Sequence, residues 1–316
     1  MPTEDVEFPS YGTTCRGFFQ TPEDAEPPYP TVILAGGWTY VKEIVLPDYA
    51  DAITEQGIAC LGFDYRNFGD SDVYEQEQHL SAWGQIEDYM AAISYAETRE
   101  DVDSERLGVF GISYSGGHSL ILSGIEPRVK CAVSVVPVVD GYDNMKRMHT
   151  MDRFYDLMDS VVQDRRDRVD GHSARMPFGK DPEINWEDAD PIECGVWPLE
   201  IIHKTFMDYK NSTAPNHEHW NTIWSLDQLI QYNVMPYCER NYDTPTKMVI
   251  TEKGESCPVD HQLEAFNALQ TPKKELSVVP ADHHSIYYDK GLLEIASEES
   301  AEFYREQLVD PFEHLD

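Results

Sequence analysis

Short runs of consecutive apolar residues alternate with amphipathic segments over the first 140 positions of the chain. Unbroken apolar runs are typical of parallel strands that are buried on both faces. Residues 43–55 and 81–98 instead carry their apolar positions at helical spacing. The alternation predicts an α/β fold, a mostly parallel central sheet covered by helices on both faces. The predicted buried strands span residues 31–35, 58–63, 107–112 and 131–139.

Two shorter segments near the N-terminus, around 6–8 and 15–19, alternate between apolar and polar residues and predict an antiparallel edge of the sheet. The alternation of predicted strands and helices stops after Asp140. Residues 141–243 contain four of the six tryptophans and no comparable strand, which predicts a mostly helical insertion lying over the sheet as a cap. The alternation then resumes, so residues 1–140 and 244–316 are expected to form the core. The later elements are strands at 247–251 and 276–279 and helices at 258–269 and 295–308.

Composition narrows the functional classes. The net charge is −34, with 58 acidic and 24 basic residues spread along the chain, which argues against nucleic acid and against an anionic membrane surface. Two explanations of the charge stay open: a salt-adapted surface, or simply an acidic enzyme. No apolar run is long enough to span a membrane, and the acidic N-terminus does not resemble a signal peptide. The six cysteines form no C-x-x-C pair, so we expect no metal site, no disulfide framework and a cytoplasmic location.

Candidate chemistry begins at Gly111-Ile112-Ser113-Tyr114-Ser115-Gly116-Gly117. A predicted strand precedes this string and a predicted helix follows it, which is the context in which a serine becomes a nucleophile. Gly111 and Ser115, two positions before and after Ser113, are small because such a turn is too sharp for bulky side chains there. The fifth position holds Ser115 where the G-x-S-x-G pattern has glycine. Ser113 is therefore the candidate nucleophile.

A serine hydroxyl needs a base, and the base needs an orienting acid. His283 and His284 follow the last predicted strand, at the sheet edge where a base could meet the serine. The chain order serine, acid, histidine fits this architecture. The backbone N–H groups of Trp38 and Tyr114 are the candidate oxyanion donors. The candidate acids, left open by position alone, are Glu252, Glu255, Asp260 and Asp140.

Several motifs together resemble α/β hydrolases of the dienelactone-hydrolase-like group, which includes esterases and the fungal polyketide transferases and thiohydrolases. The resemblance covers most of the chain outside 141–210. The motifs that carry it are Leu34-Ala35-Gly36-Gly37-Trp38, Val41-Lys42-Glu43, Gly62-Phe63-Asp64-Tyr65-Arg66-Asn67-Phe68-Gly69-Asp70-Ser71, the Ser113 string with His118, Trp220-Asn221-Thr222, Ser225-Leu226, and Thr244-Pro245 before Met248-Val249-Ile250.

The resemblance implies the α/β-hydrolase fold with Ser113 as nucleophile. The family's acid falls on Gly254, so the neighbouring Glu255 is the expected acid, with Asp260 and Asp140 as alternates. The family's final motif is His, apolar, Asp, apolar, Tyr, and the segment His283-His284-Ser285-Ile286-Tyr287 fits it best. His283 is therefore the expected base, with His284 as the alternate.

These observations predict a serine hydrolase that cleaves a carboxylic ester, lactone or thioester through an acyl-enzyme, without a cofactor or metal. The aromatic residues of the insertion favour an apolar or aromatic small-molecule substrate. A C–C bond hydrolase or acyltransferase using the same triad is one alternative. A non-catalytic binding protein on a hydrolase scaffold is another, because the usual acid is missing at position 254. The sequence leaves the oligomeric state open, a homodimer included.

Overall fold

The computed structural model describes residues 1–312 of the chain. Its centre is an eight-stranded sheet in the order β1-β2-β4-β3-β5-β6-β9-β10. β1 pairs antiparallel with β2, and β2 with β4, whereas all later pairs are parallel. The strands are β1 (Thr3–Ser10), β2 (Thr13–Gln20), β3 (Tyr29–Ala35), β4 (Ala59–Asp64), β5 (Val102–Ile112), β6 (Val129–Val135), β9 (Thr246–Lys253) and β10 (Lys274–Asp282).

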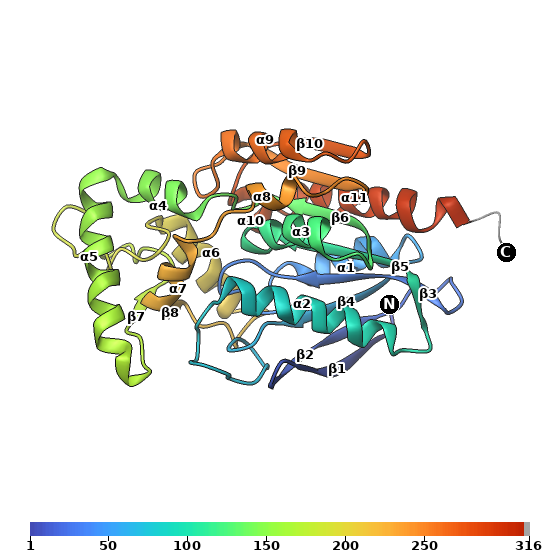
Figure 1. Cartoon of the computed structure of the whole chain (residues 1–316), viewed down its shortest axis with the longest axis horizontal. Helices are drawn as coiled ribbons and strands as arrows, with labels where there is room; N and C mark the ends of the chain where they lie inside the picture. The colour runs from blue at the N-terminus through green and yellow to red at the C-terminus, as the bar shows by residue number, and fades with distance from the viewer. Residues whose placement is uncertain (313–316) are drawn as a thin grey trace.

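Helices cover both faces of this sheet, with α2 and α3 in front of it and α1 and α11 behind it in Figure 1. The apolar runs of the strands are buried between the two helical layers and form the core. The predicted α/β-hydrolase architecture is thereby confirmed. The helices of the core are α1 (Leu46–Thr54), α2 (Ala82–Glu97), α3 (Tyr114–Ile125), α9 (Val259–Ala268), α10 (Ser285–Tyr288), α11 (Lys290–Leu308) and the short η2 (Asp310–Phe312).

The segment between β6 and β9 forms most of one end of the molecule, at the left of Figure 1. It is mostly helical, as expected, but it also contains the two-stranded antiparallel sheet β7–β8. Its last helix packs against α3 of the core. The division of the chain at 141 and 243 therefore stays a prediction. The elements are α4 (Gly141–His149), α5 (Met151–Asp167), η1 (Arg168–Asp170), β7 (Arg175–Pro177), α6 (Glu200–Lys210), β8 (Trp220–Thr222), α7 (Ile223–Leu229) and α8 (Met235–Cys238).

The apolar run at 131–139 continues beyond the strand that it forms. β6 ends at Val135, and Val136 has a positive φ of 39°, which turns the chain out of the sheet. The Val138 N–H then donates a hydrogen bond to the Ser113 carbonyl at 3.0 Å. The last apolar residues of the run are buried because they line the turn beside Ser113 and not because they extend the sheet.

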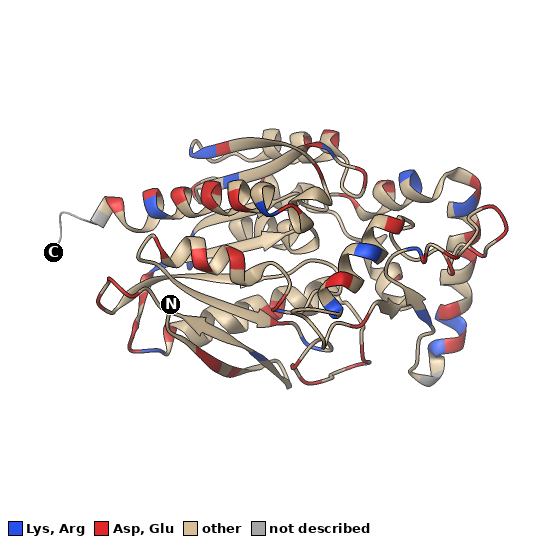
Figure 2. Ribbon diagram, turned by 180° about the vertical axis from the view of Figure 1, so that it is seen from behind, with Lys and Arg blue, Asp and Glu red and all other residues tan. Residues whose placement is uncertain are grey.

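Acidic residues are distributed over all sides of the fold rather than in one patch (Figure 2). Because 58 acidic residues face only 24 basic ones, most carboxylates cannot form an ion pair. Mutual repulsion of these charges opposes the compact state.

We therefore expect KCl to stabilise the protein. Raising KCl from about 0.1 M to about 1 M shortens the Debye length from about 10 Å to about 3 Å and screens this repulsion. The melting temperature, measured by calorimetry, should rise by roughly 2–4 °C for each kcal/mol gained. Sucrose at matched osmolality is the uncharged control. A melting temperature that does not change with the KCl concentration would contradict both the destabilising charge repulsion and the salt-adapted interpretation.

Candidate active site

Ser113 stands alone between β5, which ends at Ile112, and α3, which begins at Tyr114. Its backbone has φ 58° and ψ −114°, a conformation that costs on the order of 1–3 kcal/mol for a residue with a side chain. Hydrogen bonds hold it there. The Ser113 N–H donates to the Val135 carbonyl at 2.8 Å, and the Ser113 carbonyl accepts from Val138 and Gly117. The neighbouring strand thus fixes a sharp strand–helix turn that presents the serine hydroxyl.

The turn also explains the serine at the fifth position of the motif. A Cβ on Gly111 would lie 1.8 Å from the Ser115 carbonyl oxygen, so β5 and α3 cross where no side chain fits. The Ser115 hydroxyl donates to the Gly36 carbonyl in the loop after β3. It accepts from the Tyr65 hydroxyl at 2.6 Å. Ser115 therefore ties the turn to the loop that carries Trp38, which a glycine could not do.

The two residues whose N–H groups are the candidate oxyanion donors pack against each other through their side chains. The rings of Trp38 and Tyr114 are 5.0 Å apart, and both residues are buried. Within residues 1–312 neither main-chain N–H donates a hydrogen bond, because Trp38 lies outside the strands and Tyr114 is the first residue of α3. Both groups are thus free to bind a substrate oxygen. The Trp38 indole donates to Asn221 of β8 at 3.0 Å, which anchors this loop to the cap.

His283 and His284 follow β10 and lie buried side by side, with ring centroids 4.9 Å apart. The Asp282 carboxylate fixes the turn beneath them, since it accepts from the backbone N–H groups of His284 and Ser285 at 2.9 Å each. His284 Nε2 lies 2.7 Å from the Ser256 hydroxyl. His283 Nε2 lies 3.4 Å from the Tyr287 hydroxyl.

Burial governs the protonation of both imidazoles. It lowers the pKa of His283 well below its usual value, and the neighbouring His284 lowers it further. Burial also lowers the pKa of His284 to about 4, although the charge of Asp282 opposes the shift. Both rings are therefore neutral at pH 7, which is the form that can accept a proton.

The structure does not bring the expected acid to either histidine. Glu252 and Glu255 are exposed. Asp260 instead pairs with Arg147 at 2.9 Å. Asp140 caps α4 through the Asp143 N–H. Throughout residues 1–312, no carboxylate makes a hydrogen bond with the ring of His283 or His284.

Position 254 could not supply the acid either. A Cβ on Gly254 would lie 2.0 Å from the Cys257 carbonyl oxygen, so the backbone has closed over the space where a side chain would start. Ser256, two residues later, is the group of this loop that reaches an imidazole. The residue of this loop that bonds to an imidazole is therefore a serine and not a carboxylate.

A small cavity of about 10 Å³ lies at Ser113, which is room for about one water molecule. None of its lining residues is an Asp, Glu, Lys or Arg, and four of them come from the cap. The cavity is therefore mostly aromatic and uncharged. The core contributes Trp38, Tyr40, Ser113, Ser256, His283 and His284, and the cap contributes Phe178, Trp197, Ile202 and Phe206.

With this geometry established, similarity to known proteins becomes informative. A model of the X-Pro dipeptidyl-peptidase (S15) family matches residues 19–285, most of the chain. The chain belongs to this S15 family. "Thiohydrolase aneE" from Aspergillus aculeatus is 28% identical over 266 residues, covering 81% of this chain and 79% of that protein. "Polyketide transferase grgF" from Penicillium sp. is 26% identical over 287 residues, covering 90% of each.

The solved structures agree on the fold. The chain described as "The structure of DcsB complex with its substrate analogue" superposes with a TM-score of 0.80 at 23% identity, covering 97% of this chain and 99% of that one. The S15 member described here also shares the fold of the chain described as "Crystal structure of Alpha/beta hydrolase GrgF from Penicillium sp. sh18", with a TM-score of 0.79 at 23% identity, covering 98% of this chain and 99% of that one. Its resemblance to the fungal thiohydrolases and polyketide transferases is confirmed.

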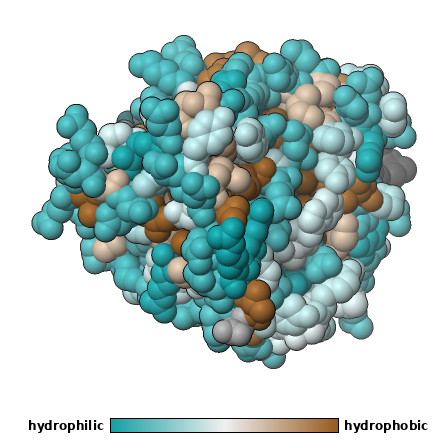
Figure 3. All heavy atoms as spheres, turned by 60° about the vertical axis from the view of Figure 1, so that its left-hand side comes forward, coloured by the Kyte–Doolittle hydropathy of each residue, from teal (hydrophilic) through white to brown (hydrophobic). Residues whose placement is uncertain are grey.

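The cap of this S15-family protein makes hydrogen bonds to three core segments near the site: the Trp38 loop, the Ser256 loop and α10. Opening the cap would therefore disturb the backbones of the site itself. Besides the Asn221 bond to Trp38, the contacts are Asn144 to the Ser256 carbonyl at 2.7 Å, Tyr209 to the Tyr287 carbonyl at 2.7 Å, and His217 to the Thr39 carbonyl at 3.2 Å. On the face that includes the cap end, apolar groups reach the surface in separate patches (Figure 3).

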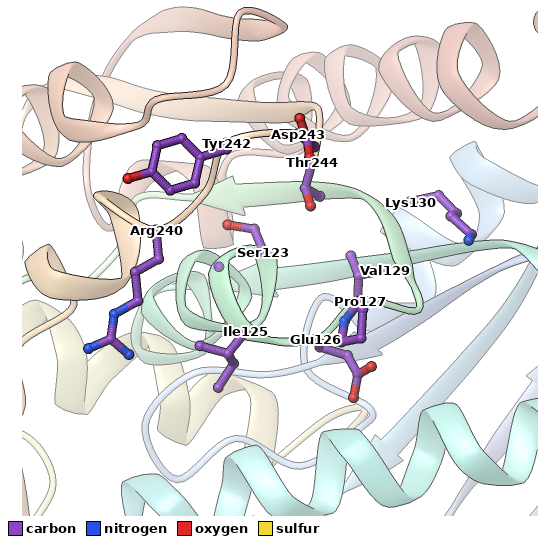
Figure 4. Close-up of a pocket in the computed structure, with 11 residues that line it drawn as sticks. Ser123, Ile125, Glu126, Pro127, Val129, Lys130, Arg240, Tyr242, Asp243 and Thr244 are labelled. Atoms are coloured by element: carbon purple, nitrogen blue, oxygen red, sulfur yellow. The ribbon is translucent and has the colours of Figure 1, made fainter.

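Other features lie away from Ser113. A surface pocket of about 610 Å³ surrounds the C-terminal end of α3, whereas Ser113 precedes the N-terminal end of that helix (Figure 4).

Within the described range, no group of three or more His, Cys, Asp or Glu side chains could hold a metal ion. No helix in that range is long and apolar enough to cross a membrane.

Two residues of the site, Ser256 and Tyr287, are not identified as site residues by the sequence. Ser256 carries no motif signal that separates it from an ordinary loop serine. Tyr287 is part of the final family motif, and it follows His283 by four positions, a spacing that brings side chains together where the chain turns helically. That spacing is the signal that could have identified it.

We expect Glu255→Gln to retain activity within about twofold, because an exposed side chain without a contact to either imidazole cannot orient the base. The measurement is kcat/KM for ester hydrolysis, with Asp260→Asn measured in parallel. A loss of kcat/KM on the order of 10³-fold in the Glu255 variant alone would instead support Glu255 as the acid that orients the base.

The buried neutral histidines also predict a pH dependence of stability. The unfolded chain binds protons near pH 6.5 that folded His284 does not bind until about pH 4, so the free energy of unfolding should fall as pH drops through this window. Each such histidine contributes up to about 1.4 kcal/mol per pH unit. His284→Asn should flatten the slope by about that amount in urea titrations, whereas His172→Asn, at an exposed position, should not.

Proposed function

We propose that this S15-family protein is a serine hydrolase that cleaves a neutral carboxylic ester, lactone or thioester through an acyl-enzyme at Ser113. The observation that carries the proposal is that the strained serine turn lines the same small cavity as two neutral imidazoles. Strain of this kind persists where the surrounding structure holds it, and it is common at catalytic nucleophiles.

In the proposed reaction, Ser113 Oγ attacks the substrate carbonyl carbon and His283 receives the serine proton. The Trp38 and Tyr114 N–H groups stabilise the negative oxygen that forms. The protonated imidazole then donates to the leaving group, and water releases the acyl group in a second cycle of the same steps. His283 is favoured over His284 as the base because His284 Nε2 already faces the Ser256 hydroxyl at 2.7 Å.

The absence of a carboxylate next to the imidazole makes His283 a weaker general base. Without an adjacent acid, the imidazolium that forms is stabilised less, so we expect slower chemistry than in a complete triad. The same absence motivates the rival proposal of a non-catalytic binding protein. The neutral state of both rings and the hydrogen bonds that hold the Ser113 turn favour the enzyme.

The lining of the cavity argues for the substrate class. An X-Pro dipeptidyl-peptidase acts on a peptide with a free, positively charged N-terminus, and such a charge needs a buried carboxylate. No carboxylate lines the cavity, whereas six of its residues are aromatic or aliphatic. An apolar acyl group fits this lining better than a peptide N-terminus does.

Acyl transfer is the second candidate, because one relative carries the name polyketide transferase and the cavity has room for only about one water molecule. An alcohol or thiol bound in place of that water would take the acyl group.

We also propose that the protein works in a reducing compartment such as the cytoplasm. All six cysteines are free and buried, which supports that location.

Ser113→Ala should lower kcat/KM for p-nitrophenyl esters and N-acetylcysteamine thioesters by a factor on the order of 10⁴ or more. The matched control is Ser119→Ala, which removes the same atom from α3 at a hydroxyl that only bonds its own helix. A fluorophosphonate probe should label Ser113, located by peptide mass spectrometry. Full activity in the Ser113 variant would overturn the mechanism. A product ester formed with added alcohol would identify acyl transfer.

A further inference from the structure

The Ser256 hydroxyl bonds to an imidazole rather than to the backbone. It lies 2.7 Å from His284 Nε2, and both side chains are buried. Within the described part of the chain, this ring is the only hydrogen-bond partner of the hydroxyl. Other buried serines, among them Ser119, Ser123 and Ser134, donate to main-chain carbonyls and so help to fix the backbone. The Ser256 hydroxyl instead has a base beside it.

Ser256 and His284 also line the small cavity at Ser113. Because this cavity has room for only about one water molecule, a carbonyl group that enters it after side chains have moved lies near both serines. A hydrogen bond between a serine hydroxyl and an imidazole is the contact that activates a serine as a nucleophile. Ser256 already makes that contact.

Another serine–histidine contact in this fold shows what a structural pair looks like. The Ser225 hydroxyl lies 3.4 Å from His79 Nδ1, but it also accepts from the Leu80 N–H at 2.9 Å and lies 2.8 Å from the Thr222 hydroxyl. That oxygen belongs to a network that joins α7 to the loop before α2. The Ser256 oxygen is closer to its imidazole, accepts from no backbone N–H of the described residues, and borders a cavity. Its lone pairs are therefore available to an electrophile.

Both members of the pair are held in place. Asn144 of α4 in the cap donates to the Ser256 carbonyl at 2.7 Å, which fixes the loop that carries the serine. The Asp282 carboxylate accepts from the His284 N–H at 2.9 Å, which fixes the base. Burial lowers the pKa of His284, and the charge of Asp282 opposes this shift. Asp282 thus both positions the base and favours its protonated form, as the third group of a nucleophile–base pair does.

We propose that Ser256 is a second nucleophile of this cavity, activated by His284 and acylated by neutral, reactive carboxylic esters. As Ser256 Oγ bonds to the carbonyl carbon, the serine proton moves to His284 Nε2. The imidazolium then donates this proton to the leaving alcohol as the carbon–oxygen bond of the substrate breaks. The products are an acyl ester on Ser256 and a free alcohol, and the imidazole ends neutral.

The environment of the ring is compatible with this role. His284 Nδ1 is buried and has no hydrogen-bond partner within residues 1–312, so no neighbour prevents it from carrying the ring proton. A neutral imidazole with its proton on Nδ1 presents a lone pair on Nε2, the atom that faces Ser256.

The inference goes beyond the proposed function, since neither Ser113 nor His283 reacts in this step. Acylation of Ser256 should be slow, because the Trp38 and Tyr114 N–H groups belong to the Ser113 turn and to the loop held against it. Loss of one oxyanion donor commonly costs on the order of 10²–10³ in rate. Ser113→Ala should therefore lose catalytic turnover but keep a residue that reactive esters modify.

The test is a map of modified residues in Ser113→Ala after overnight incubation with p-nitrophenyl acetate or with a fluorophosphonate. Peptide mass spectrometry should find an adduct on Ser256 that forms on the order of 10²–10³ times more slowly than the Ser113 adduct of the wild type. Adding Ser256→Ala or His284→Asn to this variant should abolish the adduct. Adding Ser119→Ala is the matched control and should not, since that hydroxyl bonds only its own helix.

The modified residue separates this inference from the proposed function. A wild-type adduct on Ser113 without any adduct on Ser256 in Ser113→Ala would overturn the second nucleophile and leave the hydrolase standing. An adduct on Ser256 without one on Ser113 would do the reverse. An adduct on Ser256 that persists in the His284→Asn variant would show that His284 does not activate this serine, and it would overturn the proposed pair.

Ser113→Gly covers a Ser113→Ala protein that does not fold. Because residue 113 has a φ of 58°, a glycine there relieves the strained backbone while it removes the same hydroxyl. The expected adduct is again on Ser256, and its absence from this variant would overturn the inference in the same way.

Discussion

Ser113 keeps an unfavourable backbone conformation because β5 and α3 meet there with no room for a longer turn, and hydrogen bonds from β6 and from the first turn of α3 hold the serine on both sides. Everything else in the site is arranged around that crossing. The Ser115 hydroxyl uses the same crossing to reach the Gly36 carbonyl, so the turn helps to hold the loop that carries Trp38. A change in how β6 ends would therefore reach the nucleophile and the oxyanion donors together.

The cap contributes to the site as much as it covers it. Polar side chains from α4, α6, β8 and the loop before β8 each make a hydrogen bond to a core segment that bears a site residue. Three of these bonds are buried and the bond from Tyr209 is partly buried, so most of their partners would be left unsatisfied if the cap lifted away as a rigid body. Local movement of cap side chains is less costly than full opening, which favours small rearrangements over a swinging lid.

The sequence was sufficient for the sheet and for the sharp turn at Ser113, because each depends on local patterns: unbroken apolar runs and small residues at a strand–helix junction. It was insufficient for the acid, because in a chain with 58 acidic residues the position of one carboxylate carries little information. Only the three-dimensional arrangement reveals that the backbone at Gly254 excludes a side chain and that Ser256 reaches His284. The end of β6 was misjudged for a related reason, since residues that line a buried turn are as apolar as residues in a strand.

The near absence of free volume at Ser113 has a consequence for recognition. The proposed acyl substrate needs more space than the 10 Å³ of this cavity, so it binds a form of the protein in which side chains such as Phe178, Trp197 or Phe206 have moved. The apparent affinity for every ligand is then reduced by the fraction of molecules in that form. The apparent affinity is reduced by the same factor for all substrates that require the same rearrangement. Differences in affinity between these substrates then depend on the contacts they make after the pocket has formed. A substitution that thins the aromatic packing would tighten binding across a whole series without changing its order of preference.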